Sequence, residues 1–215
     1  MRAFTVHQGV AAPIMQDNID TDQLIPSREM KRVSKSGLGA GLFAGWRYRY
    51  DGSQKIGPAE DFVLNQPAYR DASILLSGRN FGCGSSREHA VWALTDFGIR
   101  AIIAEGFGAI FRMNCGRNGL LAIDLPADQI TALQRFCEAD PQAHRLTIDL
   151  TNNRVDAGDQ HSFAFSIDEA DRHMLLNGLD FIDFSLQFRD DINRFAEAYR
   201  QQHSWAVLPP PSNVG

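Results

Sequence analysis

The chain has 215 residues, of which 44% are hydrophobic and 22% charged, values typical of a globular protein with a sizeable core. A formal net charge of -5, from 21 basic and 26 acidic residues, provides no basic footprint for nucleic acid. The amino terminus lacks the apolar stretch of a secretory signal, and no apolar run approaches the roughly 20 residues of a membrane span, so we expect a cytoplasmic protein with no nucleic-acid and no membrane partner.

The first quarter of the chain predicts one strand and two irregular segments. Residues 2–14 mix β-branched and apolar residues and run into a proline, which is typical of a strand followed by a turn. Residues 16–26 carry three aspartates, whose side chains bond the local backbone, so we expect a loop. Residues 31–57 are rich in glycine, basic and aromatic residues, and we expect them to form a mobile excursion rather than part of the core.

From residue 72 onward, strand and helix patterns alternate. Residues 72–78 form a short apolar run typical of a buried strand. Residues 85–98 predict a helix, because Ser85 and Glu88 fit a capping box and Gly98 is suited to end the helix. The same patterns predict strands at 99–105 and 120–125 and helices at 106–119 and 126–140.

The last third of the chain changes in character. Residues 145–167 are typical of strands joined by polar turns, with a hairpin candidate at Asn152-Asn153. Helical patterns follow at 168–180 and 190–203. The whole sequence therefore predicts an α/β fold, with a strand–helix core, an additional antiparallel β element and C-terminal helices.

We expect this fold to be organised as one domain. It covers residues 1–208, including a C-terminal helical extension over about 168–208. A proline-rich tail, residues 209–215, follows it.

The segment from Gly78 to His89 is the best candidate for a functional site. It leaves a predicted strand, passes three glycines and enters a helix at two serines and an arginine. The first backbone N–H groups of a helix lack intrahelical partners, and a guanidinium such as that of Arg87 binds carboxylate or phosphate with two parallel hydrogen bonds, so we infer an anion site. Gly82 and Gly84 would let the backbone approach the ligand.

The same segment is also compatible with a purely structural role. The glycines could simply form a tight turn, with Ser85 as a helix cap. The segment matches none of three known motifs, because it lacks residues that the phosphate-binding loop, the dinucleotide-binding turn and the nucleophile elbow each require. A thiol nucleophile built from Cys83 and His89 is the weakest alternative.

The cysteines Cys83, Cys115 and Cys137 are odd in number and include no Cys-x-x-Cys pair, which argues against a disulfide framework. Their spacing fits no iron–sulfur cluster pattern. We therefore expect buried, structural cysteines and no metal or cofactor bound by this chain.

Four segments resemble one known family. GRNFGCGSSREHA (78–90) resembles the active-site turn of the swivelling domain in the aconitase superfamily, and NIDTDQLIP (18–26) resembles that domain's amino-terminal signature in 3-isopropylmalate dehydratase small subunits. IFRMNCGRNGLL (110–121) and MLLNGLDFI (174–182) match the same family. The resemblance runs from about residue 4 to 190 and implies the swivelling β/β/α fold.

The resemblance also implies a function. It implies the small subunit of a two-chain hydro-lyase that isomerises 2-isopropylmalate and 3-isopropylmalate by dehydration and rehydration, in leucine biosynthesis. A separate large subunit would carry a [4Fe–4S] cluster, in a heterodimer or heterotetramer. The enzyme would be active only when both subunits are present.

Residue roles are carried over by the same resemblance. Ser85 would be the base that takes a proton from the carbon next to a carboxylate, and Ser86 and Arg87 would grip a substrate carboxylate. Thr21 and Asp22 would shape the site. The basic residues Lys31 and Arg32 would contact a carboxylate, or would form only a solvated loop face.

Two alternatives differ in substrate or in class. The same fold could serve a related 2-hydroxy diacid of the citramalate, dimethylmalate or homocitrate type. The chain could also be a non-catalytic carboxylate-binding or regulatory module, against which the intact Ser-Ser-Arg sequence speaks.

Overall fold

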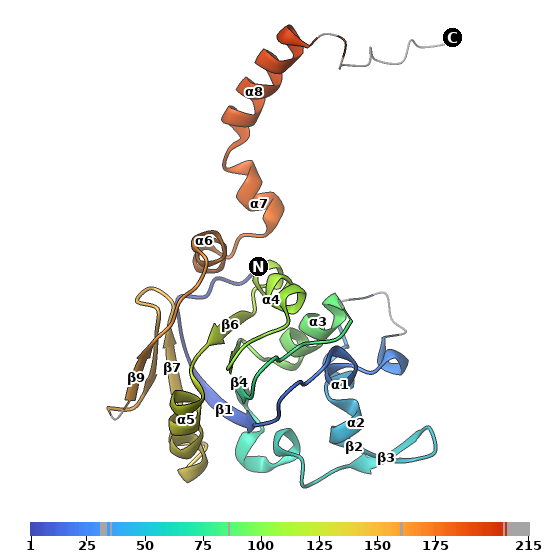
Figure 1. Ribbon diagram of the computed structural model, residues 1–215. Coiled ribbons are helices and arrows are strands. Elements are labelled where there is room, and N and C mark those ends of the chain that lie inside the picture. Colours follow the sequence, from blue (N-terminus) through green and yellow to red (C-terminus); the bar gives the residue numbers. More distant parts are fainter. Residues whose placement is uncertain (31–33, 35, 86, 160, 204, 206–215) are drawn as a thin grey trace.

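The computed structural model describes residues 1–30, 34, 36–85, 87–159, 161–203 and 205 (Figure 1). In this part of the chain the α-helices are α1 (Thr21–Leu24), α2 (Ala44–Arg47), α3 (Glu88–Phe97), α4 (Ala109–Asn118), α5 (Ala127–Ala139), α6 (Glu169–Asn177), α7 (Phe181–Leu186) and α8 (Arg189–Gln202). The strands are β1 (Val6–Ile14), β2 (Tyr48–Asp51), β3 (Gln54–Pro58), β4 (Ala72–Ser77), β5 (Ala101–Ala104), β6 (Leu121–Asp124), β7 (Leu146–Asp149), β8 (Arg154–Ala157) and β9 (His161–Ala164). Short 3₁₀ turns lie at Ser27–Glu29, Gly39–Gly41, Val63–Asn65 and Pro67–Tyr69.

One mixed sheet organises the fold. Among the described residues it has seven strands in the order β6-β5-β4-β1-β7-β8-β9. The strands β1, β4, β5 and β6 are parallel, whereas β7, β8 and β9 continue the sheet in antiparallel fashion from the other side of β1. The parallel half is the predicted strand–helix core, and the antiparallel half is the predicted additional β element, so the α/β fold class is confirmed.

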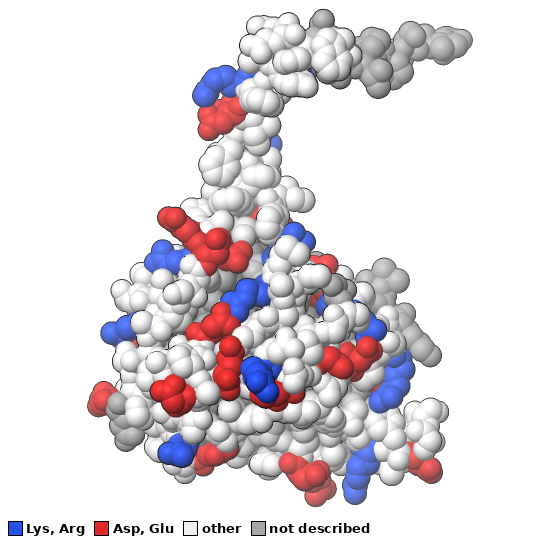
Figure 2. Space-filling model, viewed as in Figure 1, with Lys and Arg blue, Asp and Glu red and all other residues white. Residues whose placement is uncertain are grey.

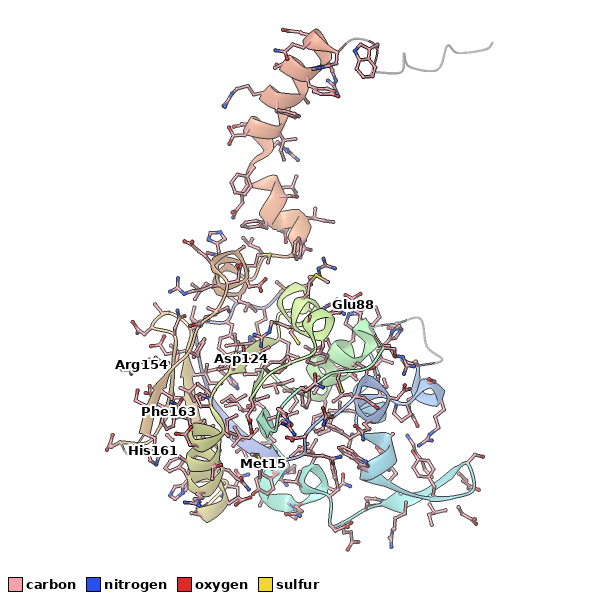
Figure 3. The ribbon with its side chains drawn as sticks, viewed as in Figure 1. Met15, Glu88, Asp124, Arg154, His161 and Phe163 are labelled. Carbon is pink, nitrogen blue, oxygen red and sulfur yellow. The ribbon has the colours of Figure 1, made fainter. Side chains whose placement is uncertain are left out.

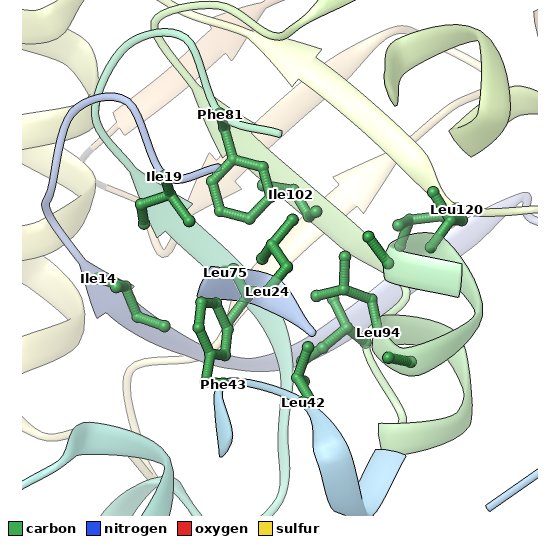
Figure 4. Close-up of a cluster of buried hydrophobic side chains, with 14 of the residues drawn as sticks. Ile14, Ile19, Leu24, Leu42, Phe43, Leu75, Phe81, Leu94, Ile102 and Leu120 are labelled. Carbon is green, nitrogen blue, oxygen red and sulfur yellow. The ribbon is translucent and has the colours of Figure 1, made fainter. Parts of the chain in front are cut away.

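Both faces of the parallel half are buried. Leu75 and Ile102 belong to a core cluster shared with α3 and α4, whereas Ile74 and Ile103 belong to a second cluster shared with α5. Figure 4 shows part of the first cluster, with Leu75 among the labelled side chains. Because successive side chains of a strand point to opposite faces, strands covered on both faces become continuous apolar runs.

Two predictions about the amino-terminal half are wrong. Residues 16–26, predicted as a loop, contain the one-turn helix α1, because the Asp20 side chain accepts from the Gln23 backbone N–H at 2.7 Å and the Gln23 side chain accepts from the Asp20 N–H at 2.8 Å. The segment 31–57 is not an excursion outside the core, since Leu42 and Phe43 are fully buried. Residues 31–33 and 35 of that segment lie outside the described part.

Glycines in this second segment serve close packing. A Cβ added at Gly39 would lie 2.7 Å from the backbone nitrogen of Phe97, and one added at Gly41 would lie 2.7 Å from the Glu29 Cβ. The glycines that predicted mobility therefore allow residues 38–44 to pack against α3 and the Glu29 turn.

The carboxyl-terminal helices leave the body of the molecule. The helix α6 packs on α4, and α7 and α8 project away from the sheet (Figure 1). The predicted helix at 190–203 corresponds to α8, whereas α7 has no counterpart among the predicted helices, and the tail at 209–215 lies outside the described residues. No helix in the described part of the chain has the length and apolar character that a bilayer crossing requires.

Candidate active site

Three connections meet at the carboxyl ends of the parallel strands. They are the segments that follow β1, β4 and β5, and backbone hydrogen bonds join them directly. Gly82 N–H donates to the Ile19 carbonyl at 2.7 Å, and Phe81 N–H donates to the Gly106 carbonyl at 2.9 Å. Ligands of open α/β sheets bind at this edge, outside the carboxyl ends of the strands. The glycine-rich turn therefore lies where the architecture favours a site.

Glycine at position 82 is required by conformation and by space. Its φ is +71°, and an added Cβ would lie 2.2 Å from the Phe111 ring. The backbone at Gly82 therefore packs closely against the Phe111 ring, which is a side chain of this protein and not a ligand. Gly84, with φ +86°, is exposed and lies against Asp20 and Thr21, where an added Cβ would be 3.3 Å from the Asp20 Cβ.

Thr21 holds the backbone of Ser85. The buried Thr21 hydroxyl donates to the Ser85 carbonyl oxygen at 2.7 Å, and its oxygen lies 3.4 Å from the Ser85 Oγ. The Thr21 backbone N–H also donates to the Cys83 carbonyl at 3.0 Å. Thr21 begins α1, so this short helix fixes the turn that carries Ser85. The structure thus places the Asp-rich segment directly against the turn that carries Ser85.

Arg87 and Asp22 form an ion pair across the same junction. The Arg87 Nη1 donates to Asp22 Oδ1, and the side chains are 24% and 56% exposed respectively. The contact lies at the surface, so its contribution to stability is small, of the order of 0–1 kcal/mol. The ion pair matters for geometry, because it holds the Arg87 guanidinium in a fixed orientation. A guanidinium has five N–H donors, which leaves capacity for a ligand carboxylate beside Asp22.

The predicted helix cap at Ser85 is wrong. The helix α3 begins at Glu88, and the preceding Arg87 is extended and makes no capping bond through its side chain. Ser85 therefore stands three positions before the helix, in an exposed part of the turn. Glu88 bonds elsewhere, since its Oε1 accepts from the Asn118 side chain at 2.9 Å. The Ser85 oxygen consequently does not lie at the start of α3.

A pocket of about 250 Å³ joins the turn to a different helix. Its lining includes Ser85 and Arg87 on one side and the first turn of α4, from Ala109 to Phe111, on the other. The N-cap of α4 is Gly108, which has no side chain to bond the first N–H groups. This contribution of α4 is not among the features predicted from the sequence, although the Gly106-Phe107-Gly108 sequence before the helix is a signal for it. Arg87 is the charged residue among the described lining residues, so the pocket suits an anion.

Cys83 and His89 do not come together at the site. Cys83 lines the pocket, whereas the His89 ring packs on Trp92 with ring centroids 4.8 Å apart and lies outside the lining. This placement gives no support to a Cys–His nucleophile. The other candidate residues Ser86, Lys31 and Arg32 lie outside the described part of the chain.

The two buried cysteines are poor ligands for a metal. Burial raises the pKa of the Cys115 thiol well above its usual range, and burial together with the nearby Glu138 raises the pKa of Cys137 to about 12. The thiolate is the form that binds metal. In the described part of the chain no three His, Cys, Asp or Glu side chains gather in a way that could hold a metal ion. The described residues therefore do not fit an iron–sulfur cluster.

The class of protein follows from comparison with known families. A family model described as the aconitase C-terminal domain matches residues 1–128. A crystal structure of 3-isopropylmalate dehydratase from Methanocaldococcus jannaschii has the same fold, with a TM-score of 0.63 and 25% identity over 89% of this chain and 99% of that chain. The predicted swivelling domain of the aconitase type is thereby confirmed.

Curated relatives define the family more narrowly. The 3-isopropylmalate dehydratase small subunit of Cupriavidus necator is 53% identical over 95% of this chain and 98% of its own length. The protein of the same name from Methylorubrum populi is 48% identical over 96% of this chain and the whole of its own. This chain belongs to the family of 3-isopropylmalate dehydratase small subunits.

Proposed function

We propose that this chain is the small subunit of a hydro-lyase that interconverts 2-isopropylmalate and 3-isopropylmalate in leucine biosynthesis. The observation that carries the proposal is the shared pocket of Ser85 and Arg87, in a chain about half identical to subunits that bear this name. The substrate is a small hydroxy diacid, and the pocket offers a fixed cation and the first turn of a helix for its carboxylates. We place the reaction in the cytoplasm, in keeping with a role in amino-acid biosynthesis.

Ser85 takes the proton in this proposal. The Ser85 oxygen, as alkoxide, accepts the proton from the carbon next to a carboxylate, and the electron pair of that C–H bond becomes the second bond to the neighbouring carbon as hydroxide leaves it. In rehydration, hydroxide adds to the carbon that lost the proton, and Ser85 returns the proton to the carbon that lost hydroxide. The Thr21 hydroxyl has a single proton, which it donates to the Ser85 carbonyl at 2.7 Å, so Thr21 positions Ser85 through its backbone. The neutral Ser85 hydroxyl can donate to the Thr21 oxygen, but the alkoxide has no proton for that bond.

Arg87 binds a substrate carboxylate in this proposal, and Asp22 holds the guanidinium in position. The planar fork of an arginine matches a carboxylate with two parallel hydrogen bonds, which a lysine cannot reproduce. Ser86 is assigned to the same carboxylate by its place in the sequence between Ser85 and Arg87. Lys31 and Arg32 are proposed as further carboxylate contacts. Gly82 and Gly84 set the path of the turn.

The partner is a large subunit with a [4Fe–4S] cluster. The described part of this chain offers no ligand set for such a cluster, so the group belongs to the other chain in our proposal. When bound there, it supplies the Lewis acid for the hydroxyl group of the substrate. The small subunit contributes the base and the carboxylate clamp, and neither chain is active alone.

The test is reconstitution. The chain is mixed anaerobically with the large subunit from the same organism, and turnover is measured with 2-isopropylmalate, citramalate, dimethylmalate and homocitrate. We expect the highest kcat/KM with 2-isopropylmalate and no turnover by either subunit alone. A higher kcat/KM with another of these diacids would refute the substrate assignment. An assembled complex that turns over none of them would refute the enzymatic role.

A further inference from the structure

The two C-terminal helices form an arm that stands away from the body (Figure 1). We define this arm as α7 and α8 with the following described residues, His203 and Trp205. Neither α7 nor α8 contains a buried residue. A pair of helices without a single fully buried residue is unusual in a folded protein, because packing of an apolar face supplies most of the stability of a helix.

The root of the arm is fixed to the body. The Arg117 guanidinium of α4 lies 5.0 Å above the Phe181 ring, and the His173 ring of α6 meets Phe184 edge-on at 5.8 Å. The His173 Nε2 and the Gln187 Oε1 are 3.2 Å apart. Asp180 caps α7 with a reciprocal capping box. These contacts give the arm a defined direction of departure.

One face of α8 is apolar along the helix. From the N-cap residue onward the apolar residues recur at spacings of four, three and four, at Phe188, Ile192, Phe195 and Tyr199. Aromatic rings stack in sequence along this face. The ring centroids of Phe195 and Tyr199 are 5.8 Å apart, and those of Tyr199 and His203 are 4.4 Å apart. In the space-filling view the arm is largely white, whereas charged side chains are spread over the body (Figure 2).

The apolar residues on the arm are strongly exposed. Phe195 is 70% exposed and Ile182 68%, and the exposed large apolar side chains on the described part of the arm are Phe181, Ile182, Leu186, Phe188, Ile192, Phe195, Tyr199 and Trp205. Aromatic side chains bury about 150–250 Å² each, so this set presents on the order of 800 Å², close to one partner's share of a standard protein interface. Patches on monomeric proteins are usually smaller, about 300–600 Å².

The energetics of α8 point the same way. A helix of 14 residues is near the length at which isolated helices are marginal in water, about 12–15 residues. Packing of its apolar face against another surface would supply the missing stability. The helix carries three arginines against two aspartates and one glutamate, so its association is driven by apolar burial rather than by net charge.

The root of the arm meets a second pocket, and one residue of that pocket adjoins the candidate active site along the chain. A second pocket is lined by Glu88, Arg117, Asn118, Asp180, Phe181 and Ile182. Glu88, labelled in Figure 3 where α3 begins, follows Arg87 directly in sequence and bonds Asn118 of α4. Arg87 of the candidate site and Glu88 of the root pocket are thus neighbours in the chain, and the root pocket reaches Phe181 and Ile182 of α7.

We propose that the arm is a docking element for the large subunit, whose surface would cover the pocket at its root and the apolar face of α8. This assignment rests on the proposed function for the identity of the partner. A chain that binds over the root pocket and α8 would lie next to the candidate site, because Glu88 of that pocket follows Arg87. A second copy of this chain bound to α8 alone would leave the root pocket and the Arg87 side open.

The experiment compares two matched variants in the complete chain. The arm variant is Ile192→Ala/Phe195→Ala. The control is Asn193→Ala/Glu197→Ala, which lies on the opposite face of the same helix at 3.6 residues per turn. Binding to the large subunit is measured by titration calorimetry, and sedimentation velocity gives the oligomeric state of each isolated chain. Thermal unfolding checks that the body is intact.

We expect the arm variant to raise the Kd for the large subunit about tenfold or more, the scale of losing an aromatic anchor, while the control stays close to the wild type. Its kcat at saturating large subunit should remain normal, because the site is untouched. An unchanged Kd overturns the proposal. So does an isolated wild-type dimer that the arm variant dissociates while the Kd for the large subunit stays the same, since the occupant would then be a second copy.

Failure of the proposed function has a different signature. In that case the wild-type chains assemble tightly but the complex turns over no hydroxy diacid. The Kd comparison between the arm and control variants still decides the role of the arm.

Discussion

The Thr21 hydroxyl and Ser85 are linked twice, by a 2.7 Å hydrogen bond to the Ser85 carbonyl oxygen and by a 3.4 Å approach to the Ser85 Oγ. One residue thus holds the backbone of the proposed base and lies beside its side chain. Thr21 is itself buried at the start of α1, which gives it a rigid support. The one-turn helix α1 is therefore part of the catalytic arrangement we propose.

Replacing Thr21 tests this link. Thr21→Val keeps the shape but removes the donor, so we expect kcat to fall by about 10–100-fold, as expected for a misplaced catalytic group. The loss of one hydrogen bond should cost only about 1 kcal/mol of stability. Thr21→Ser restores the hydroxyl and should recover most of the activity. Equal kcat values for the Val and Ser variants would show that the hydroxyl does not position Ser85.

Arg87→Lys tests the carboxylate clamp. The substitution keeps the charge but loses the planar fork, so KM for 2-isopropylmalate should rise about tenfold, equivalent to about 1.4 kcal/mol, with kcat little changed. Steady-state kinetics of the reconstituted enzyme measures both constants. An unchanged KM together with a reduced kcat would contradict a role in substrate binding.

Asp22→Asn tests how much the ion pair contributes to the carboxylate-binding role of Arg87. The ion pair of Asp22 with Arg87 is exposed on the Asp22 side, so losing it should change binding by no more than about 1 kcal/mol, or about fivefold in KM. We therefore expect a smaller rise in KM than for Arg87→Lys. A larger effect than that of Arg87→Lys would mean that Asp22 itself contacts the reacting groups.

His7 predicts a pH dependence of stability. Burial, followed by the charges of Arg100 and Arg2, lowers the pKa of His7, whose Nε2 lies 2.8 Å from the Ser73 Oγ. As pH falls below about 6.5, the usual histidine pKa, the unfolded chain gains a proton that the folded chain resists, so the free energy of unfolding falls. The slope from this partly exposed site stays below the single-site limit of about 1.4 kcal/mol per pH unit.

Denaturant unfolding of the wild type and of His7→Gln between pH 7.5 and 5.5 measures this contribution. The glutamine variant should lose less stability over that interval. Identical pH slopes would remove His7 as the cause.

The cysteines predict the behaviour of the isolated chain. With the thiols of Cys115 and Cys137 buried and their pKa values raised, the chain purified anaerobically without its partner should be colourless and contain no stoichiometric iron. Visible absorbance and iron analysis provide the measurement. One iron–sulfur cluster per chain would contradict our assignment of the cluster to the large subunit.

The part of the fold that could be predicted from sequence is the part that local signals define. Buried parallel strands such as 72–77 are continuous apolar runs, and Gly98 and Gly119 end α3 and α4 in the left-handed conformation. The glycine-rich turn is recognisable as a site because glycine, serine and arginine together exceed the needs of a helix cap. The structure joins that turn to Thr21 and Asp22 through hydrogen bonds and an ion pair, and their role in shaping a substrate site stays a prediction.

The errors arise where one signal has two meanings. The Asp20 and Gln23 pair is a capping signal, but the other aspartates make the segment resemble a loop. Gly39 suggests mobility, although it permits backbone contact with Phe97. Ser85 and Glu88 have the spacing of a capping box. In the structure the Ser85 carbonyl accepts from Thr21 and the Glu88 carboxylate accepts from Asn118 instead. The helix α3 therefore starts later than predicted, at Glu88. The role of α4 required three-dimensional proximity that no local pattern contains.

The most direct test of the account is the kcat of Ser85→Ala in the reconstituted two-chain enzyme. Because Ser85 does not cap α3, the variant should fold, melt and bind the large subunit like the wild type. We predict a kcat lower by at least about 10²–10⁴-fold, the usual contribution of a general base, with KM near normal. Ser86→Ala, its neighbour, should mainly raise KM. Near-normal turnover by Ser85→Ala would contradict the central claim and place the base on another residue.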